Sequence, residues 1–266
     1  MIAALPMYDW PEIRHHTERF WQVLRQMLAD HGIGGAVPQN LSRAGDPHAL
    51  WLDPGLLIGQ TCGLPFVNEL EGKVTLLGSP TYAIGCGPGN YRSVLIAGEG
   101  REDIDPFKTP SLRFAYNDPR SQSGLAAWLS GVLQAGGKLP KGLVPVRTGS
   151  HRASIQAVAE DSADLAAIDA VTFELARRLD PAARRVSVIG HTPETPGLPF
   201  IASATFSGRK DQLCCAIEDA IAELDEETSQ ALLITCFKRR GEEDYRPIAE
   251  SWQAVKAAGL DKLFVA

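Results

Sequence analysis

Strand-like and helix-like segments alternate along most of this chain, and this alternation is the strongest constraint on its fold. An apolar run at residues 2–7 reads as a strand, and residues 11–30 follow with apolar side chains at helical spacing. The alternation continues through residues 143–190. Segments ordered in this way form βαβ units, in which helices cover a mostly parallel sheet. We therefore expect an α/β fold.

The remaining elements can be assigned from the same patterns. Further strands are expected at residues 36–41, 56–61, 74–78, 91–97, 112–116, 143–146, 165–169, 186–190 and 200–205. Further helices are expected at residues 47–53, 123–133, 150–159, 171–178, 210–224, 226–234 and 245–258.

Two segments rich in glycine or proline, residues 85–90 and 190–197, interrupt the alternation. We interpret them as two crossings between lobes. Lobe one then comprises residues 1–88 plus 195–266, and lobe two comprises residues 89–194. Ligands of open α/β sheets bind beyond the carboxyl ends of the strands. The sequence therefore predicts a ligand cleft between the lobes, built from the residues that follow the strands.

Composition excludes several classes of protein. A net charge of -6 argues against a nucleic-acid-binding protein, which normally carries a basic face. No apolar run reaches the roughly twenty residues of a membrane span, so no membrane insertion is expected. The chain also lacks a Walker loop, a His-Glu-x-x-His motif, a zinc-type Cys/His cluster and a Gly-x-Ser-x-Gly elbow. We therefore expect neither a metal nor a cofactor.

The N-terminus and the cysteines bear on the compartment. Residues 2–8 are too short for a secretory leader and run directly into charged residues. A cytoplasmic protein is expected if Met1 is the native start, and otherwise a leader has been removed. The five cysteines leave at least one thiol unpaired. Cys62 and Cys86 lie in Gly-rich turns and are either free or joined in a disulfide, whereas Cys214 and Cys215 are expected in the core.

Two polar turns, residues 117–124 and 148–154, each open a helix. The first turn of a helix has unpaired N–H donors and a partial positive charge, so both turns are suited to bind an anion. Ser121 and Ser123 are the hydroxyl donors expected in the first turn, although either serine could instead cap the helix. In the second turn, the imidazolium of His151 would donate a charge-assisted hydrogen bond to the same anion.

Side chains at other strand ends complete the candidate site. The aromatic residues Tyr8, Trp10 and Tyr91 either line the pocket or pack at the hinge, and Asp169 either contacts ligand or caps the next helix. The full set of candidate ligand-binding residues is Tyr8, Trp10, Gln60, Thr61, Tyr91, Ser121, Gln122, Ser123, Thr148, Ser150, His151 and Asp169.

Several motifs resemble those of the phosphate-, phosphite- and phosphonate-type solute-binding proteins of ABC importers. They are Gln60-Thr61-Cys62-Gly63, Tyr91-Arg92-Ser93, Asn117-Asp118-Pro119-Arg120-Ser121-Gln122-Ser123-Gly124, Thr148-Gly149-Ser150-His151, Ala167-Ile168-Asp169 and Pro196-Gly197-Leu198-Pro199-Phe200. The resemblance implies a two-lobed type 2 periplasmic-binding-protein fold, a periplasmic location and an ABC permease as partner. It also implies a phosphate, phosphite or phosphonate-like ligand. Ser121, Ser123 and His151 would hold its oxyanion, and Asp169 would meet a ligand amine.

Two other functions are compatible with the same fold. Some type 2 clamps resemble biosynthetic enzymes such as those that make the thiamin pyrimidine, and His151 and Cys62 would then be the reactive residues. The other alternative is a cytoplasmic ligand sensor or partner-binding module.

Overall fold

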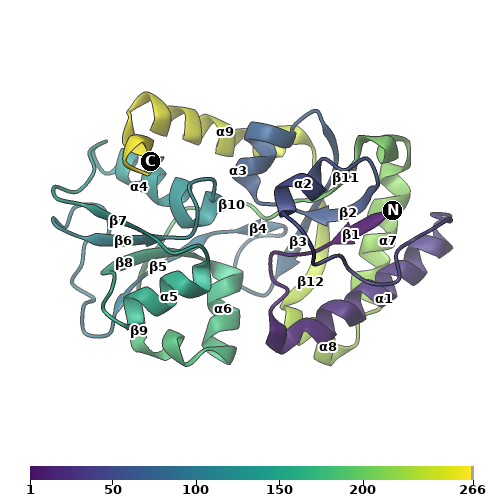
Figure 1. Cartoon of the computed structure of the whole chain (residues 1–266), viewed down its shortest axis with the longest axis horizontal. Coiled ribbons are helices and arrows are strands. Elements are labelled where there is room, and N and C mark those ends of the chain that lie inside the picture. The colour runs from purple at the N-terminus through teal and green to yellow at the C-terminus, as the bar shows by residue number, and fades with distance from the viewer. Residues whose placement is uncertain (265–266) are drawn as a thin grey trace. The chain divides into compact units, whose positions relative to one another are not determined.

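The computed structural model describes residues 1–264, and its chain divides into two units (Figure 1). The first unit comprises residues 1–90 and 196–246, and the second comprises residues 91–195 and the segment from Pro247 onward. We expected residues 195–266 in a single lobe. The structure instead places the end of the chain in the second unit, because Val255, Leu260 and Phe264 are buried in the apolar core of that unit.

A five-stranded sheet forms the centre of the first unit, in the order β1-β2-β11-β3-β12. Its strands are β1 Ile2–Ala4, β2 Leu56–Gln60, β3 Val74–Tyr82, β11 Phe200–Ser203 and β12 Ile234–Arg239. Strands β1 and β2 are parallel, whereas β11 runs antiparallel to both β2 and β3, and β12 runs antiparallel to β3. Strand β11 follows the second crossing, so it enters this sheet from the opposite direction.

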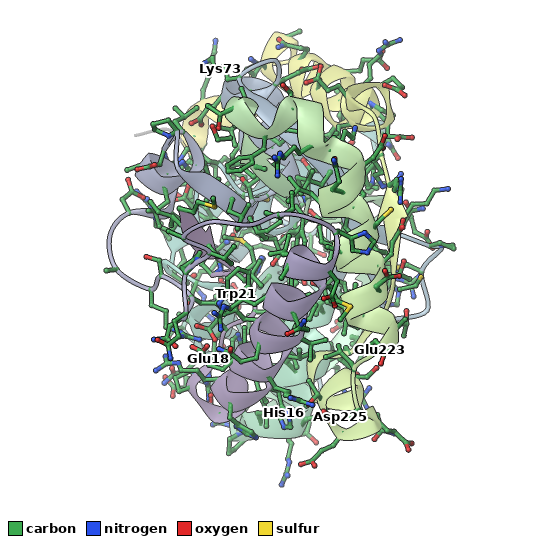
Figure 2. All side chains as sticks on the ribbon, turned by 90° about the vertical axis from the view of Figure 1, so that its right-hand side faces the viewer. His16, Glu18, Trp21, Lys73, Glu223 and Asp225 are labelled. Atoms are coloured by element: carbon green, nitrogen blue, oxygen red, sulfur yellow. The ribbon has the colours of Figure 1, made fainter. Side chains whose placement is uncertain are left out.

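The helices of the first unit pack around this sheet. They are η1 Pro11–Ile13, α1 Arg14–Asp30, α2 Pro47–Trp51, α3 Gly63–Pro65, η2 Phe66–Leu70, η5 Ala204–Arg209, α7 Lys210–Ala222 and α8 Glu226–Leu232. Helix α1 packs against α7 and α8, and its buried face carries Trp21 and Leu24. Figure 2 shows this side of the unit, and Nδ1 of His16 on α1 lies 3.3 Å from the hydroxyl oxygen of Thr228 on α8.

A second five-stranded sheet, in the order β7-β6-β8-β5-β9, forms the second unit. Its strands are β5 Ser93–Gly98, β6 Arg113–Tyr116, β7 Val144–Arg147, β8 Leu165–Asp169 and β9 Val186–His191. Strand β6 is parallel to β7 and β8, whereas β5 is antiparallel to β8 and β9. Both sheets are thus mixed, and the expected mostly parallel arrangement is wrong. The short strands β4 Asn90–Tyr91 and β10 Thr195–Pro196, at the two crossings, form a sheet of their own.

Helices cover the second sheet and close its core. They are η3 Gln122–Ala126, α4 Ala127–Gln134, α5 His151–Ala159, α6 Ala170–Leu179, η4 Pro181–Arg185 and η6 Leu260–Leu263. Helix α9, Glu242–Ala257, begins in the first unit and ends in the second, with Pro247 at the boundary. Phe114 of β6 stacks on Trp128 of α4 with ring centroids 3.9 Å apart, and Phe264 meets both rings edge-on. This aromatic contact anchors the first turn of α4, which lies just beyond the candidate site.

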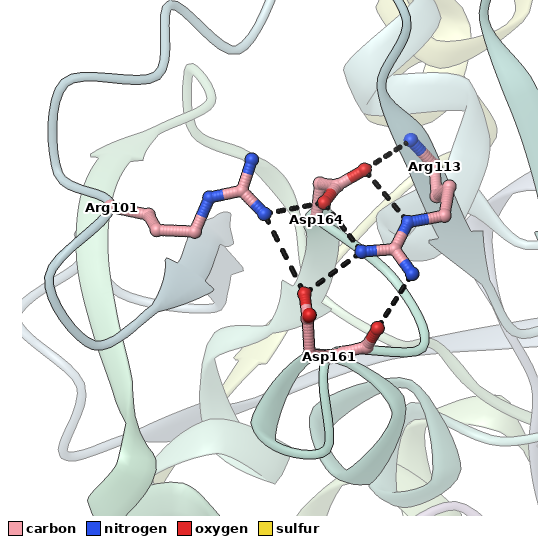
Figure 3. Close-up of polar contacts among 4 residues, drawn as sticks. All are labelled: Arg101, Arg113, Asp161 and Asp164. Atoms are coloured by element: carbon pink, nitrogen blue, oxygen red, sulfur yellow. Dashed lines mark hydrogen bonds and ion pairs between the residues drawn. The ribbon is translucent and has the colours of Figure 1, made fainter.

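An ion-pair cluster joins β6 to the turn before β8 (Figure 3). The guanidinium of Arg113 bonds both carboxylate oxygens of Asp164, at 3.0 and 2.8 Å. Arg101 binds the same carboxylate, and both arginines also reach Asp161. Because Asp164 is buried, these contacts fix the position of β8 relative to β6.

One predicted strand is absent, and one predicted helix is two residues shorter than expected. Residues 36–41 form a loop with no strand. The helix predicted at residues 226–234 ends at Leu232, because Leu233 adopts the left-handed conformation with φ of 60° and Ile234 begins β12. None of the five cysteines, Cys62 and Cys86 included, forms a disulfide within residues 1–264. None of the helices within residues 1–264 combines the length and apolar composition of a membrane span.

Candidate functional site

The first polar turn begins where β6 ends at Tyr116. Ser121 caps the helix that follows, since its Oγ accepts the N–H of Gly124 at 2.9 Å. The first turn is π-helical, and the Ala126 N–H reaches back to the Ser121 carbonyl at 3.1 Å. The cap occupies an oxygen lone pair of Ser121 but leaves its hydroxyl hydrogen free to donate. The capping role and the anion-binding role predicted for Ser121 are therefore compatible.

Gly124 allows this turn to close tightly. A Cβ atom at this position would lie 1.8 Å from Oδ1 of Asn117 and 3.0 Å from Oγ of Ser121. Any side chain at this position would therefore displace the carboxamide of Asn117. The residue lets the main chain of the helix start approach the residues at the end of β6.

The second polar turn lies against the first. The main-chain N–H and the hydroxyl of Thr148 both donate to the Tyr116 carbonyl, at 2.9 and 3.1 Å, and the Gly149 N–H donates to the Asn117 carbonyl. Ser150 then caps α5 by accepting the N–H of Ala153 at 3.0 Å. The two helix starts are thus joined by main-chain hydrogen bonds at the carboxyl ends of β6 and β7.

Ser123 and His151 meet between these helix starts. Oγ of Ser123 lies 3.0 Å from Nε2 of His151. The hydroxyl of Ser93, on β5, donates to the main-chain carbonyl of Ser123 at 2.8 Å. Ser121, Gln122 and Ser123 are each at most 6% exposed. A sheet strand and two helix starts therefore converge on Ser123.

His151 is neutral at physiological pH in this structure. Burial lowers the pKa of His151 to about 4, an effect that the nearby Ala167 carbonyl only partly opposes. The charged imidazolium expected from the sequence is a donor to a bound anion, and it stays a prediction. Within residues 1–264, the hydrogen bonds given above for Ser121, Ser123 and His151 and the pKa of His151 involve no Lys, Arg, Asp or Glu side chain. The site consists of neutral donors and acceptors.

Two buried polar atoms at this site have no hydrogen-bond partner within the described residues. They are Oδ1 of Asn117 and Nδ1 of His151. Nearly all buried polar atoms in folded proteins are hydrogen-bonded, so unpaired atoms call for an explanation. Both lie beside the helix start that the sequence singled out. Unsatisfied polar atoms at one place are typical of a site that is completed by a ligand.

The other predicted residues of the second unit have structural roles as well. The hydroxyl of Thr148 also contacts Oγ of Ser154 at 2.6 Å, so it stabilises the second turn. Asp169 caps α6 by accepting the N–H of Thr172 at 3.0 Å, and it pairs with Ser93 across the β5–β8 register. Tyr91 is buried, with 2% of the residue exposed.

In the first unit, Tyr8 and Gln60 line one cavity of about 40 Å³ together with Tyr82. The Gln60 amide donates to the Tyr82 hydroxyl at 3.3 Å, and the rings of Tyr8 and Tyr82 meet edge-on. Trp10 and Thr61 are not among the lining residues. The Thr61 N–H instead donates to the Pro199 carbonyl at 3.1 Å.

Sequence reasoning left Ser93 out of the site, and it left Tyr82 out of the ligand-binding set. Ser93 follows Tyr91-Arg92 at the start of an apolar strand, where a polar residue commonly marks the end of a strand and indicates no further role. Its contact with Ser123 joins residues thirty positions apart, which no local pattern reveals. Within residues 1–264, no group of three His, Cys, Asp or Glu side chains could hold a metal ion.

Comparison with known proteins identifies the family. The model of the family described as "ABC transporter, phosphonate, periplasmic substrate-binding protein" matches residues 61–252. The chain therefore belongs to this family of periplasmic substrate-binding proteins, which serve transport and are not enzymes. The resemblance drawn from the sequence motifs is confirmed. No curated protein sequence matches the chain significantly.

Solved structures share the fold at low sequence identity. A binding protein component of an ABC phosphonate transporter from Pseudomonas aeruginosa has a TM-score of 0.68 and 18% identity, covering 97% of this chain and 87% of the other. PhnD1 from Prochlorococcus marinus, solved with methylphosphonate, has a TM-score of 0.68 and 16% identity, with 96% and 97% covered. XAC2383 from Xanthomonas citri, solved with ATP, has a TM-score of 0.68 and 14% identity, with 100% and 99% covered. The expected periplasmic-binding-protein fold is confirmed.

Proposed function

We propose that this protein captures a phosphate, phosphite or small phosphonate through the helix start at Ser121–Gly124 and delivers it to an ABC permease. The observation that carries the proposal is the convergence of Ser121, Ser123 and His151 at one buried helix start. The partial positive charge of the helix N-terminus and the two serine hydroxyls favour an oxyanion. Membership of the phosphonate-type family supports the same ligand class.

The roles of the individual residues follow from their contacts. The hydroxyls of Ser121 and Ser123 would each donate to a ligand oxygen, and the main-chain N–H groups of the first turn would add further bonds. Gln122 and Tyr91 would contribute from the same unit. In the first unit, Tyr8 and Gln60 line the small cavity, and they remain predicted ligand contacts.

Asp169 bears on the organic part of the ligand. Its carboxylate is buried and accepts the Thr172 N–H, so a ligand amine would have to bind alongside this helix cap. A ligand that carries an amine would gain from this acceptor, whereas methylphosphonate would not.

Calorimetric titration of the whole protein tests the proposal. The panel comprises phosphate, phosphite, methylphosphonate, 2-aminoethylphosphonate, ATP and sulfate. We expect at least one of the first four to bind, and Ser123→Ala to weaken that binding by tenfold or more. Ser187 lies on β9, and its hydroxyl donates to Glu102. The control variant Ser187→Ala should leave the affinity unchanged. Binding of none of the phosphorus oxyanions, or equal affinity in Ser123→Ala, would contradict the proposal.

A further inference from the structure

We infer that capture of an oxyanion at Ser123 is coupled to protonation of His151. This inference rests on the proposed function and extends it, because it makes ligand affinity depend on pH through a single residue. It starts from the contact between Oγ of Ser123 and Nε2 of His151, at 3.0 Å.

In the ligand-free protein, Ser123 and a neutral His151 together carry too few polar hydrogens to bond each other and also bind an anion. A neutral imidazole carries one N–H, and its other nitrogen accepts. When the hydrogen is on Nδ1, the only hydroxyl hydrogen of Ser123 is directed to Nε2 and is not available to a ligand. When the hydrogen is on Nε2, Nδ1 remains a buried acceptor with no partner among residues 1–264. The first tautomer therefore leaves no hydroxyl hydrogen for the ligand, and the second leaves Nδ1 without a hydrogen-bond donor.

A charged ring removes this conflict. Both nitrogens of an imidazolium donate. Nε2 then donates to Oγ of Ser123, and the Ser123 hydroxyl is free to donate to the oxyanion. The nearby Ala167 carbonyl, which favours the charged form, would attract the N–H that Nδ1 of a charged ring carries. The proton gained by His151 thus converts Ser123 from a donor to histidine into a donor to the ligand.

The bound anion supplies the electrostatic driving force. An oxyanion on Ser123 would place its charge about 5 Å from the imidazole. At an effective dielectric constant of about 20, one negative charge at that distance raises the pKa of His151 by about 2.4, and two charges raise it by about 5. Burial holds that pKa at about 4 in the free protein. A dianion, with twice the charge, therefore brings the ring to its charged form at neutral pH.

The charged side chains around α5 do not set the protonation state of His151. The titratable or charged residues on the elements packed against α5, or next to those elements, are Arg92, Arg113, Tyr116, Asp164, Asp169, Glu174, Arg177, Arg178, Asp180, Arg184, Arg185 and His191. Arg113 is paired with Asp164, Glu174 with Arg177 and Arg178, and Asp180 with Arg152 of α5 itself. None of them contributes to the pKa of His151, which is set by burial and the Ala167 carbonyl.

The proton balance differs between ligand forms. A fully ionised phosphonate brings no proton, so His151 takes one from solvent when it binds. A monoanion with a P–OH group carries a proton that it can transfer to the pair, and uptake from solvent is then small. Affinity for the dianion should fall about tenfold per pH unit between the pKa of the ring in the free protein and its higher pKa in the complex, and should level off above the latter.

The direct test is NMR of the full chain labelled with ¹⁵N-histidine, at pH 8, without and with saturating methylphosphonate. The chain has six histidines, and the His151→Gln variant identifies the relevant signals. We expect a neutral His151 ring in the free protein and a charged ring in the complex. A ring that stays neutral while methylphosphonate binds would overturn the inference and leave the proposed function intact.

Calorimetry in two buffers of different ionisation enthalpy provides the second measurement. At pH 8 we expect uptake approaching one proton per site beyond what the ligand itself gains, and its loss in His151→Gln. The control variant His31→Gln, altered at a histidine that pairs with Asp219 in the first unit, should keep the uptake. Equal uptake in wild type and His151→Gln would refute the coupling. Failure of every phosphorus oxyanion to bind would instead refute the proposed function, and the coupling with it.

Discussion

The hydroxyl of Ser93 donates to the main-chain carbonyl of Ser123 at 2.8 Å, so this hydrogen bond attaches the helix start of the candidate anion site to strand β5. Ser93 is 1% exposed, and its own N–H is bonded to the Thr192 hydroxyl at 2.9 Å. The two residues are thirty positions apart, and the bond between them fixes where the helix start sits over the sheet. Ser93 is therefore a positioning residue for Ser123.

Replacing this serine should loosen the site and lower stability. Ser93→Ala removes a buried hydrogen bond to the Ser123 carbonyl, a change that costs about 1–2 kcal/mol in the free energy of unfolding. Urea denaturation measures this loss, and titration with methylphosphonate measures the accompanying drop in affinity. Ser187→Ala deletes a half-buried surface hydroxyl and should change neither quantity. If the two variants were equally stable, Ser93 would have no positioning role.

The pH dependence of stability should reveal His151 in the ligand-free protein. Its pKa is lowered by burial from 6.5 to about 4, so the unfolded chain binds more protons than the folded one between these values. The contribution is complete above pH 6.5 and declines as the pH falls toward 4, by as much as about 3 kcal/mol. Below pH 4 it changes no further.

The measurement compares urea denaturation of wild type and His151→Gln across pH 7 to 4. The variant should lose less stability over this range, because its side chain does not titrate. His191, whose pKa is also lowered by burial, remains in both proteins, so the difference isolates His151. Parallel pH profiles would show that His151 is not neutral in the folded protein.

Local patterns predicted most elements because the apolar periodicities are strong. The strand at residues 165–169 and the helices that begin near Pro11 and Lys210 lie where the sequence places them. Residues 36–41 were expected to form a strand, but a loop with Pro38 lies there instead. Strand β12 was missed because its exposed, charged sequence lacks an apolar run, and only its pairing with β3 defines it.

The candidate site was predictable in part. Ser121, Ser123 and His151 are all near helix starts, and the sequence placed them there. Their mutual contact depends on the parallel pairing of β6 with β7, which brings the two turns together. The neutral state of His151 depends on burial by residues distant in sequence, so no local pattern indicates it.

The ion-pair cluster offers a matched pair of substitutions. The Asp164 side chain is 7% exposed and accepts from Arg113 and Arg101, whereas the Asp161 side chain is 80% exposed. The arginines hold the pKa of Asp164 well below its usual range, so its charge is strongly stabilised in the folded state. Asp164→Asn should cost about 1.5–3 kcal/mol by removing the charged acceptor that both guanidinium groups share. Asp161→Asn should cost less than about 1 kcal/mol.

Urea denaturation at pH 7 measures both costs. The contribution of the Asp164 charge is present above the pKa of an unfolded aspartate and is lost as the pH falls through the lower pKa of the folded state. The difference between wild type and Asp164→Asn should therefore shrink below about pH 4. Similar costs for the two variants would show that burial does not control the strength of this cluster.

The approach of β12 to β3 makes a prediction for the first unit. Gly78 of β3 has φ of 152° and pairs with Arg239 of β12. A Cβ atom at Gly78 would lie 2.3 Å from the main-chain oxygen of Lys238 and 2.8 Å from the Phe237 ring. A main-chain oxygen cannot move aside as a flexible side chain can, so Gly78→Ala must push the strands apart.

We expect Gly78→Ala to lower the free energy of unfolding by at least about 3 kcal/mol, the upper part of the range for overpacked sites. The matched control is Gly34→Ala, where a Cβ atom would have no neighbour within 4 Å and the backbone φ is not positive. Its stability should stay within about 0.5 kcal/mol of wild type. Urea denaturation of the two variants decides the matter, and a Gly78→Ala protein as stable as Gly34→Ala would show that β12 does not pack this closely on β3.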